Sequence, residues 1–352
     1  MKNRANEIDF REVVNSWYLQ NKRDLPWRRS SDPYRIWLSE IILQQTRIDQ
    51  GLPYYLRFIK TFPTVFDLAE ASEQQVLKLW QGLGYYSRAR NLHYTAKEVA
   101  YEMEGIFPKS FSELKKLKGV GEYTASAIAS ICYGEAVAVV DGNVYRVLSR
   151  YFGVDTPINA TEGIRYFKEL ATRVLDLEHP GDYNQAIMEF GAMQCKPQLP
   201  LCASCGLQIS CVAFQLQRVD KLPVKLKKNK IKKRYFNYIV LLDHQHTLLE
   251  ARTKKDIWQH LYQFPLVESN DNLSLDELTK KEDFLDLISG KSYDIRLFNP
   301  KVSVHKLSHQ HIYTQFWIVE LKEPIPNGIH RKNIREYPVP VLIANFVKDF
   351  GL

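Results

Sequence analysis

The stretch LKGVGEYTASAIAS, residues 117–130, decides the fold of the first half of this 352-residue chain. Gly119 and Gly121 bracket Val120, and two glycines this close permit a tight turn between helices and expose backbone N–H groups. Such N–H groups, together with a helix N-terminus, form an anion site that a phosphate of nucleic acid would fit. An ordinary turn explains the same residues.

Helical patterns extend outward from this turn over residues 1 to about 215. In DPYRIWLSEIILQQT, Asp32 suits the N-cap and Pro33 the first helical position. The apolar residues that follow have the spacing of a buried helical stripe, and they are Tyr34, Trp37, Leu38, Ile41 and Ile42.

The pattern changes after residue 234. The segments YFNYIVLLD, HTLLEAR and QFWIVEL are rich in β-branched and aromatic residues and predict strands, whereas LDELTKKEDFLDLI predicts a helix. We therefore expect a mainly α domain at 1–215, a basic linker at 216–234 and a smaller α+β domain at 235–352.

The charge of the chain is concentrated in the linker. Residues 218–234 carry nine Lys or Arg and one acid, which equals the whole net charge of +8. The segment is either a solvated linker or a phosphate-binding element. The composition, 45% hydrophobic and 25% charged, is ordinary for a soluble protein. No apolar run of about 18 residues predicts a membrane span, and the opening MKNRANEIDF lacks a signal-peptide core. We therefore expect a reducing cytosol.

Four of the five cysteines lie in CKPQLPLCASCGLQISC, residues 195–211, with the spacing C-x6-C-x2-C-x5-C. Such a cluster in a reducing compartment indicates a metal site. Thiolate ligands suit zinc and an iron–sulfur cluster equally well. The fifth, Cys132, lies among small apolar residues and is expected to be a buried hydrophobic residue.

Two acids stand in apolar surroundings. Asp141 follows the run AVAVV and precedes Gly142 and Asn143, so it either caps the next helix or holds a carboxylate at a pocket. Glu40 lies beside Ile41 and Ile42. It is either an exposed acid or a partly desolvated one, whose raised pKa would let it donate a proton near neutral pH.

Together, the glycine turn, the VDGN aspartate and the four-cysteine spacing resemble the helix-hairpin-helix DNA glycosylases with an iron–sulfur cluster, the endonuclease III superfamily. The resemblance implies a phosphate-binding hairpin at Gly119, Val120 and Gly121. It also implies a [4Fe–4S] cluster on Cys195, Cys202, Cys205 and Cys211. Members that cleave the strand carry a lysine where this chain has Tyr123, so the chain looks like a simple hydrolytic glycosylase.

Further segments resemble the adenine DNA glycosylases, the MutY type, over nearly the whole chain. They are DLPWRR (24–29), WLSEIILQQTR (37–47), QGLGYYSRARNLH (81–93), VDGNVYRVLSR (140–150), YNQAIMEFGAMQC (183–195), IWQHLYQFP (257–265) and HKLSHQ (305–310). The resemblance implies a monofunctional enzyme with little or no lyase activity. Its substrate would be adenine paired with 8-oxoguanine or guanine in double-stranded DNA.

The same resemblance implies roles for single residues. Glu40 would protonate adenine N7, and Asp141 would stabilise the cationic sugar, with Tyr123 and Asn143 positioning it or the incoming water. The adenine pocket would include Trp27, Arg28, Leu43 and Gln185. Gln45 and Tyr85 would wedge into the duplex beside the extruded base.

The C-terminal part resembles the Nudix fold. The Nudix box G-x5-E-x7-R-E-x2-E-E-x-G is absent from the sequence, so no pyrophosphatase activity is expected. The stretch KLSHQ matches the loop that senses the damaged base, and it places Leu307, Ser308 and His309 there.

The resemblance also implies a setting: a monomer in a bacterial cytoplasm, associated with the nucleoid through DNA. A sliding clamp or other repair factors are further partners that it allows. Three alternatives stay open at this stage: a pyrimidine-directed glycosylase, a non-catalytic iron–sulfur scaffold, and a Nudix hydrolase with a DNA-binding arm.

Overall fold

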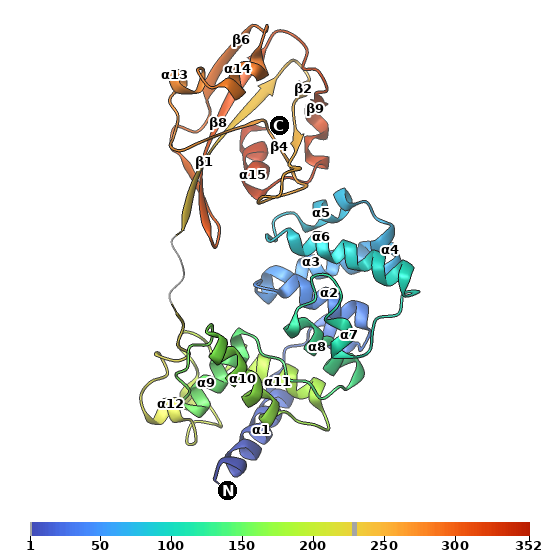
Figure 1. Cartoon of the computed structure of the whole chain (residues 1–352), viewed down its shortest axis with the longest axis vertical. Helices are drawn as coiled ribbons and strands as arrows, with labels where there is room; N and C mark the ends of the chain where they lie inside the picture. Colours follow the sequence, from blue (N-terminus) through green and yellow to red (C-terminus); the bar gives the residue numbers. More distant parts are fainter. Residues whose placement is uncertain (1, 227–230) are drawn as a thin grey trace. The chain divides into compact units, whose positions relative to one another are not determined.

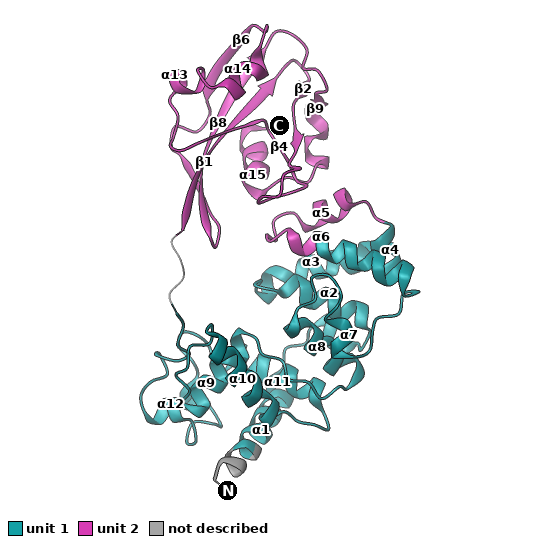
Figure 2. Ribbon diagram, in the orientation of Figure 1, with its two compact units in different colours: residues 1–70, 91–227 teal, residues 71–90, 228–352 magenta. Residues whose placement is uncertain are grey.

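The computed structural model describes residues 2–226 and 231–352, and residues 227–230 of the expected linker lie outside it. The chain divides into two compact units, shown in teal and magenta in Figure 2. Unit 1 comprises residues 1–70 and 91–227, and unit 2 comprises residues 71–90 and 228–352. None of the helices in the described residues is long and apolar enough to cross a membrane.

Unit 1 is helical (Figure 1). Its first helices are α1 (Lys2–Asn21), η1 (Pro26–Arg29), α2 (Pro33–Leu43), α3 (Ile48–Thr61) and α4 (Val65–Glu70). After the 71–90 segment come the last residues of α6 (Ser87–Lys97), then η2 (Glu98–Glu102), α7 (Phe111–Leu114), α8 (Glu122–Tyr133), α9 (Gly142–Phe152), α10 (Thr161–Val174), α11 (Pro180–Met193), η3 (Cys202–Ser204) and α12 (Val212–Gln215).

The α2 helix forms as the sequence predicts. The Asp32 side chain accepts a hydrogen bond from the Tyr34 N–H, and Pro33 occupies the first turn. All five residues of the predicted stripe are buried, which fixes the face of α2 that packs in the interior. A second apolar cluster joins α1, α9, α10 and α11 around Phe10, Leu148, Phe167 and Phe190. The VDGN segment and the cysteine loop are both attached to this cluster.

Unit 2 is an α+β domain. Its strands are β1 (Lys232–Leu242), β2 (His246–Thr247), β3 (Glu250–Ala251), β4 (Tyr262–Gln263), β5 (Leu266–Ser269), β6 (Tyr293–Leu297), β7 (Ser303–Lys306), β8 (Gln310–Leu321) and β9 (Ile329–His330). The main sheet has the order β6-β8-β1-β2-β9, with β5 paired to β1 and β7 to β8. The long strands β1 and β8 run parallel and side by side (Figure 1).

Helices cover both faces of this sheet. Ile239 and Leu241 of β1 pack in one apolar cluster with Phe284 of α14 (Glu282–Ile288). On the other face, Phe316 of β8 stacks on Phe346 of α15 (Val341–Phe350) with ring centroids 4.1 Å apart. The remaining short helices are α13 (Leu275–Leu278) and η4 (Arg331–Glu336). A mainly α part followed by a smaller α+β part is therefore confirmed.

Residues 71–90 contain α5 (Glu73–Trp80) and pack within unit 2, although they lie in the range expected for the first domain. The Lys78 ammonium donates to the Tyr337 carbonyl oxygen at 3.2 Å. Arg90 donates to the Gln259 carbonyl oxygen at 2.8 Å, and His260 Nδ1 lies 2.5 Å from a Glu73 carboxylate oxygen. These polar contacts link segments far apart in the sequence, which is why the local pattern did not reveal them.

Three details of the predicted secondary structure need correction. LDELTKKEDFLDLI is two helices, α13 and α14: the buried Leu278 and Phe284 are six positions apart, so on one continuous helix they would point in directions about 120° apart. HTLLEAR holds two strands of two residues each, β2 and β3. β1 begins at Lys232, so the last residues of the expected linker belong to the sheet.

Candidate active site

A pocket of unit 1 collects most of the residues singled out from the sequence. It is lined from η1, α2, α8, α11 and the start of α9. Eight predicted residues line it: Trp27, Arg28, Glu40, Leu43, Tyr123, Asp141, Asn143 and Gln185. The residues that the sequence analysis did not single out include Arg23, Ile131, Met188 and Glu189. Carboxyl groups, guanidinium groups and apolar side chains thus line a single pocket.

Glu40 enters the pocket from the buried face of α2 and is only 8% exposed. Burial raises the pKa of Glu40 to about 7, and the nearby charge of Asp141 adds to this, against a hydrogen bond with Tyr123 and the charge of Arg28. The desolvated alternative is therefore correct, because the helix turns this acid inward with its apolar neighbours. A carboxyl group with this pKa can donate a proton near neutral pH.

Asp141 both caps α9 and lines the pocket, so the two alternatives drawn from the sequence hold together. Its Oδ1 accepts the backbone N–H groups of Asn143 and Val144 at 2.9 and 2.8 Å, and Oδ2 accepts the Asn143 side-chain amide at 2.7 Å. Burial raises the pKa of Asp141, and these donors oppose the rise. Three donors aimed at both oxygens hold the carboxylate in one orientation.

Arg146, which the sequence analysis did not single out, holds Asn143 in turn. Its guanidinium donates to the Asn143 side-chain oxygen at 2.8 Å, the Gly191 carbonyl at 2.7 Å and the Cys195 carbonyl at 2.7 Å. A chain of hydrogen bonds therefore runs from Asp141 through Asn143 and Arg146 to the first residue of the cysteine loop.

Glu189 of α11 is the most buried acid of the pocket, and its side chain is 2% exposed. It accepts two hydrogen bonds from the Arg23 guanidinium and two from that of Arg28, at 2.6 to 3.0 Å. Burial raises the pKa of Glu189, but the hydrogen bonds from both arginines outweigh it and lower the pKa to about 2. The ionised Glu189 therefore fixes Arg28 at the wall of the pocket.

Tyr123 lies on the first turn of α8, immediately after the glycine turn. Burial, and then the charges of Glu40 and Asp141, raise the pKa of Tyr123 well above its ordinary value, so the side chain is a neutral phenol. Its hydroxyl donates to the Met188 sulfur at 3.2 Å. None of the described residues that line this pocket is a lysine, so no side-chain amine is placed there to form a Schiff base.

The glycine turn has the predicted geometry. Gly119 has φ +81°, and a Cβ there would lie 2.7 Å from the Asn91 side chain, so both conformation and space require glycine. Val120 is buried, and Gly121 is the N-cap of α8. The turn therefore presents the N-terminus of α8.

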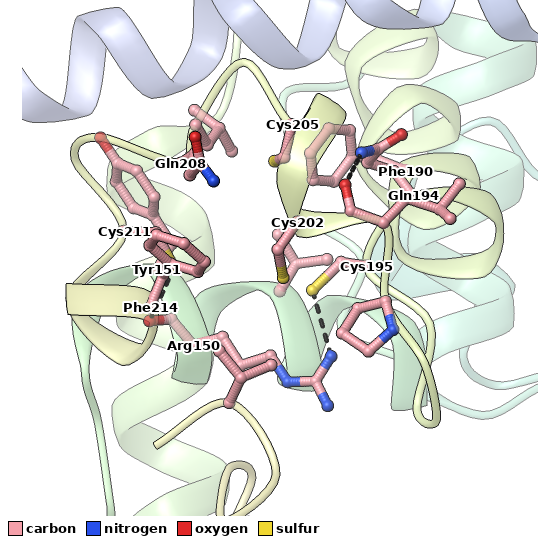
Figure 3. A pocket seen from close by; sticks show the side chains of 15 residues that line it. Arg150, Tyr151, Phe190, Gln194, Cys195, Cys202, Cys205, Gln208, Cys211 and Phe214 are labelled. Atoms are coloured by element: carbon pink, nitrogen blue, oxygen red, sulfur yellow. Dashed lines mark hydrogen bonds between the residues drawn. The ribbon is translucent and has the colours of Figure 1, made fainter. Parts of the chain in front are cut away.

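The four cysteines of the loop line one mainly apolar cavity, shown in Figure 3. Phe190, Tyr151 and Leu207 contribute to its walls. Arg150 donates to the Cys195 sulfur at 3.4 Å and to the Lys196 carbonyl at 2.7 Å. Among the described residues, no group of three or more His, Cys, Asp or Glu side chains is arranged to hold a metal ion. The shared cavity and the donor set of four thiols fit a thiolate-bound cluster.

Cys132 does not join this loop. It is half-buried, and burial raises the pKa of its thiol to about 12. The thiol is therefore protonated, although its side chain is only half-buried and not fully buried as the sequence predicts.

A second pocket lies within unit 2. It is lined by Tyr85 and Arg90, by Asp256 and Trp258, and by the four residues Lys306, Leu307, Ser308 and His309. The Leu307 N–H donates to the Gln310 carbonyl at 2.8 Å, which closes the 307–309 turn between β7 and β8. Ser308 Oγ lies 3.3 Å from His309 Nδ1. Tyr85, with φ +49° and an exposed ring, belongs to this pocket.

Gln45 lies outside both pockets. It is exposed, follows the α2 C-cap Gln44, and has φ +54°. A glutamine held in the left-handed region is strained, and such strain is common at functional positions.

Comparisons with known proteins assign both units. A sequence profile described as "HhH-GPD superfamily base excision DNA repair protein" matches residues 38–172, and one described as "NUDIX domain" matches residues 237–349. The "Adenine DNA glycosylase" of Buchnera aphidicola subsp. Baizongia pistaciae is 34% identical over 318 residues, which cover 88% of this chain and 86% of that protein. This chain belongs to the adenine DNA glycosylase family.

Other matches agree. The Homo sapiens "Adenine DNA glycosylase" is 44% identical over 222 residues, which cover 60% of this chain and 41% of the human protein. The solved structure of a thermostable thymine-DNA glycosylase aligns with a TM-score of 0.57 and 28% identity, covering 61% of this chain and all of that one. An endonuclease III–DNA complex aligns with a TM-score of 0.52 and 20% identity, which shows a shared fold.

As a member of the adenine DNA glycosylase family, the chain is a base-excision DNA repair enzyme. This assignment excludes the non-catalytic scaffold and the Nudix hydrolase with a DNA-binding arm. The residues that sequence reasoning missed are Arg23, Arg146, Met188 and Glu189. Glu189 carries the same signal that drew attention to Glu40, an acid within an apolar helix (AIMEFGAM, 186–193). The partners of Arg146 are distant backbone oxygens, for which the sequence holds no signal.

Proposed function

We propose that this chain hydrolyses the N-glycosidic bond of adenine paired with 8-oxoguanine or guanine in duplex DNA, without cleaving the strand. The observation that carries the proposal is the buried Glu40, with its pKa raised to about 7, facing a firmly held Asp141 in one pocket. A buried carboxyl group that can carry a proton and a second one held by three hydrogen-bond donors suit an acid and a stabilising carboxylate.

Adenine extruded from the duplex would enter the unit 1 pocket between Trp27, Leu43 and the polar Gln185. Glu40 then donates its proton to N7, so that adenine leaves as a neutral base. The departing base leaves a cationic, oxocarbenium-like sugar. A general acid of this kind typically contributes roughly 10²–10⁴-fold to the rate.

Asp141 stabilises that cation. Because its oxygens already accept three hydrogen bonds from fixed donors, the carboxylate needs little reorganisation when positive charge develops. Tyr123 and Asn143 would position Asp141 or the attacking water. With no lysine among the described residues that line the pocket, water is the expected nucleophile and the reaction ends at the abasic site.

The four cysteines, Cys195, Cys202, Cys205 and Cys211, would hold a [4Fe–4S] cluster. Four thiols on one apolar cavity, with the Arg150 guanidinium beside Cys195, support this assignment. The cluster would brace the loop that supplies the Cys195 carbonyl to Arg146. The hairpin of Gly119, Val120 and Gly121 would bind a DNA phosphate at the N-terminus of α8.

Unit 2 would read the base opposite adenine. Adenine is a normal base, so discrimination must come from the other strand. The pocket formed by Tyr85 and the 307–309 turn offers a flat ring, an apolar Leu307 and the polar groups of Ser308 and His309 toward a base edge. Gln45 and Tyr85, both held at positive φ, would wedge into the duplex.

Single-turnover base release tests the proposal, with duplexes that carry one adenine opposite 8-oxoguanine, guanine or thymine. Strand breaks that appear only after hot alkali, and only opposite 8-oxoguanine and guanine, are expected. Breaks without alkali would contradict the hydrolytic mechanism. Base release from the thymine-paired duplex at the same rate would contradict the opposite-base reading.

A further inference from the structure

An exposed face of unit 2 carries three cationic or titratable side chains in one row. Lys233 of β1 pairs with His311 of β8, and His311 pairs with Lys306 of β7. Residues paired across neighbouring strands project from the same face of a sheet. Lys233 and Lys306 are exposed and His311 is half-buried, so the row lies at the surface.

An aromatic pair forms the next row on the same face. Tyr235 pairs with Tyr313 two residues further along β1 and β8. Their rings stack with centroids 4.9 Å apart and an interplanar angle of 22°, and the Lys233 ammonium lies 5.9 Å from the Tyr313 ring centroid. The stack stiffens the base of the row, and both phenols remain partly exposed.

On the opposite face of the same strands, the cationic side chain has carboxylate partners. Arg234 points to that face and pairs with the carboxylates of Asp256 and Glu268 at 2.9 and 2.6 Å. Among the described residues, by contrast, no ion pair joins Lys233, Lys306 or His311 to a carboxylate. The two lysine charges lie on the same face on either side of His311, where they repel each other and neither has a carboxylate partner. An uncompensated row beside a neutralised arginine therefore points to an external anion.

The position of the row indicates which anion. Lys306 ends β7 directly before Leu307, Ser308 and His309, and it lines the same pocket as they do. Neighbouring strands lie about 4.8 Å apart, so the row spans roughly 10 Å. Three consecutive phosphates of one DNA strand span about 7 Å along the axis, a distance that the flexible lysine side chains at the two ends of the row can reach.

We propose that Lys233, His311 and Lys306 bind consecutive phosphates of the DNA strand whose base the 307–309 turn reads. The row sets the register of that strand before any base is read, because phosphate contacts position a nucleic acid and base contacts specify it. This inference rests on the proposed function, since it takes the same DNA as partner.

The test is the salt dependence of binding to a catalytically unreactive duplex of the same length, measured with the full chain. Lys233→Gln combined with Lys306→Gln removes two phosphate contacts. The slope of log affinity against log salt should become shallower by about 1.8, since each phosphate contributes about 0.9. The loss of affinity should be equal for duplexes with and without 8-oxoguanine.

The matched control is Lys232→Gln combined with Lys322→Gln. Both residues are exposed in unit 2, Lys232 projects from the opposite face of β1, and the net charge change is the same. A slope change in the control equal to that of the test pair, or no change in either, would overturn the inference. A loss confined to 8-oxoguanine duplexes would also overturn it, because it would indicate base reading. Thermal unfolding of each variant verifies that the fold is intact.

The outcome separates this inference from the proposed function. Suppose that the wild-type chain releases adenine and that the slope of log affinity against log salt is unchanged in the Lys233 and Lys306 variant. This outcome would reject only the proposal that the row binds phosphates. Absence of adenine release, with the predicted change of slope, would reject the proposed substrate and keep the row as a DNA-binding surface.

Discussion

Arg146 joins the cysteine loop to the α9 N-cap: its guanidinium lies 2.7 Å from the Cys195 carbonyl oxygen and 2.8 Å from the Asn143 side-chain oxygen. Asn143 in turn donates to Asp141 at 2.7 Å. The position of the proposed catalytic carboxylate therefore depends on a backbone atom of the loop that would hold the cluster.

Replacing Arg146 should impair base release without direct contact with DNA. Lys cannot donate to two carbonyls and Asn143 with the fork geometry of Arg, so Asp141 loses its fixed orientation. We expect Arg146→Lys to lower the single-turnover rate roughly 10²-fold, the typical effect of a small misplacement of a catalytic group. Arg165→Lys, an exposed position on α10, is the control. A wild-type rate in Arg146→Lys would contradict this dependence.

The pKa of Glu40 predicts a pH dependence. Because Glu40 must be protonated to act and its pKa is raised to about 7, single-turnover base release should level off below that pH, until protonation of Asp141 lowers the rate again in acid. Above the pKa of Glu40, the rate should fall about tenfold per pH unit. The groups that face Glu40 are Tyr123, Asp141 and Arg28. Tyr123→Phe removes the hydrogen bond that lowers the Glu40 pKa, so its profile should shift to higher pH. A shift to lower pH would contradict the assignment.

Glu189 should be a major source of stability. Removing its charge leaves Arg23 and Arg28 without their shared buried partner, so Glu189→Gln should lower the free energy of unfolding by about 3–5 kcal/mol. Its pKa is depressed to about 2, so this stabilisation is present above the unfolded pKa and is lost as pH falls through about 2. Urea unfolding at neutral pH and near pH 3 measures both effects. Glu113→Gln, which breaks an exposed pair with Lys116, should cost under about 1 kcal/mol.

The 307–309 turn should determine the preference for 8-oxoguanine over guanine opposite adenine, and not the cleavage step itself. Ser308→Ala combined with His309→Ala removes the polar groups that this turn offers to a base edge, so the rate ratio between 8-oxoguanine and guanine duplexes should fall. Ser303→Ala, on the neighbouring β7, serves as the control. An unchanged ratio in the double variant would show that the base is read elsewhere.

Much of the site could be predicted from short segments. The Asp32 cap and the stripe of α2 follow from local pattern, and they orient Glu40 inward with Ile41 and Ile42. Asp141 could be predicted as a candidate because it directly follows a run of apolar residues. In both cases the information lies within a single turn or two of the chain.

What escaped prediction depends on contacts between distant segments. The sequence places residues 71–90 within the predicted helical domain. In the structure they belong to unit 2, where they form hydrogen bonds with Gln259 and Tyr337. The row of Lys233, His311 and Lys306 likewise depends on the register of β1, β8 and β7, which brings these residues to one face. No local pattern encodes such a register.

Glu40 and Asp141 are proposed to act in cleavage of the glycosidic bond and not in DNA binding. The most direct measurement compares single-turnover adenine release with DNA affinity for Glu40→Gln and Asp141→Asn, opposite 8-oxoguanine. Each variant should nearly abolish base release, by at least about 10²-fold, while affinity stays close to wild type. A near wild-type rate in either variant would contradict it.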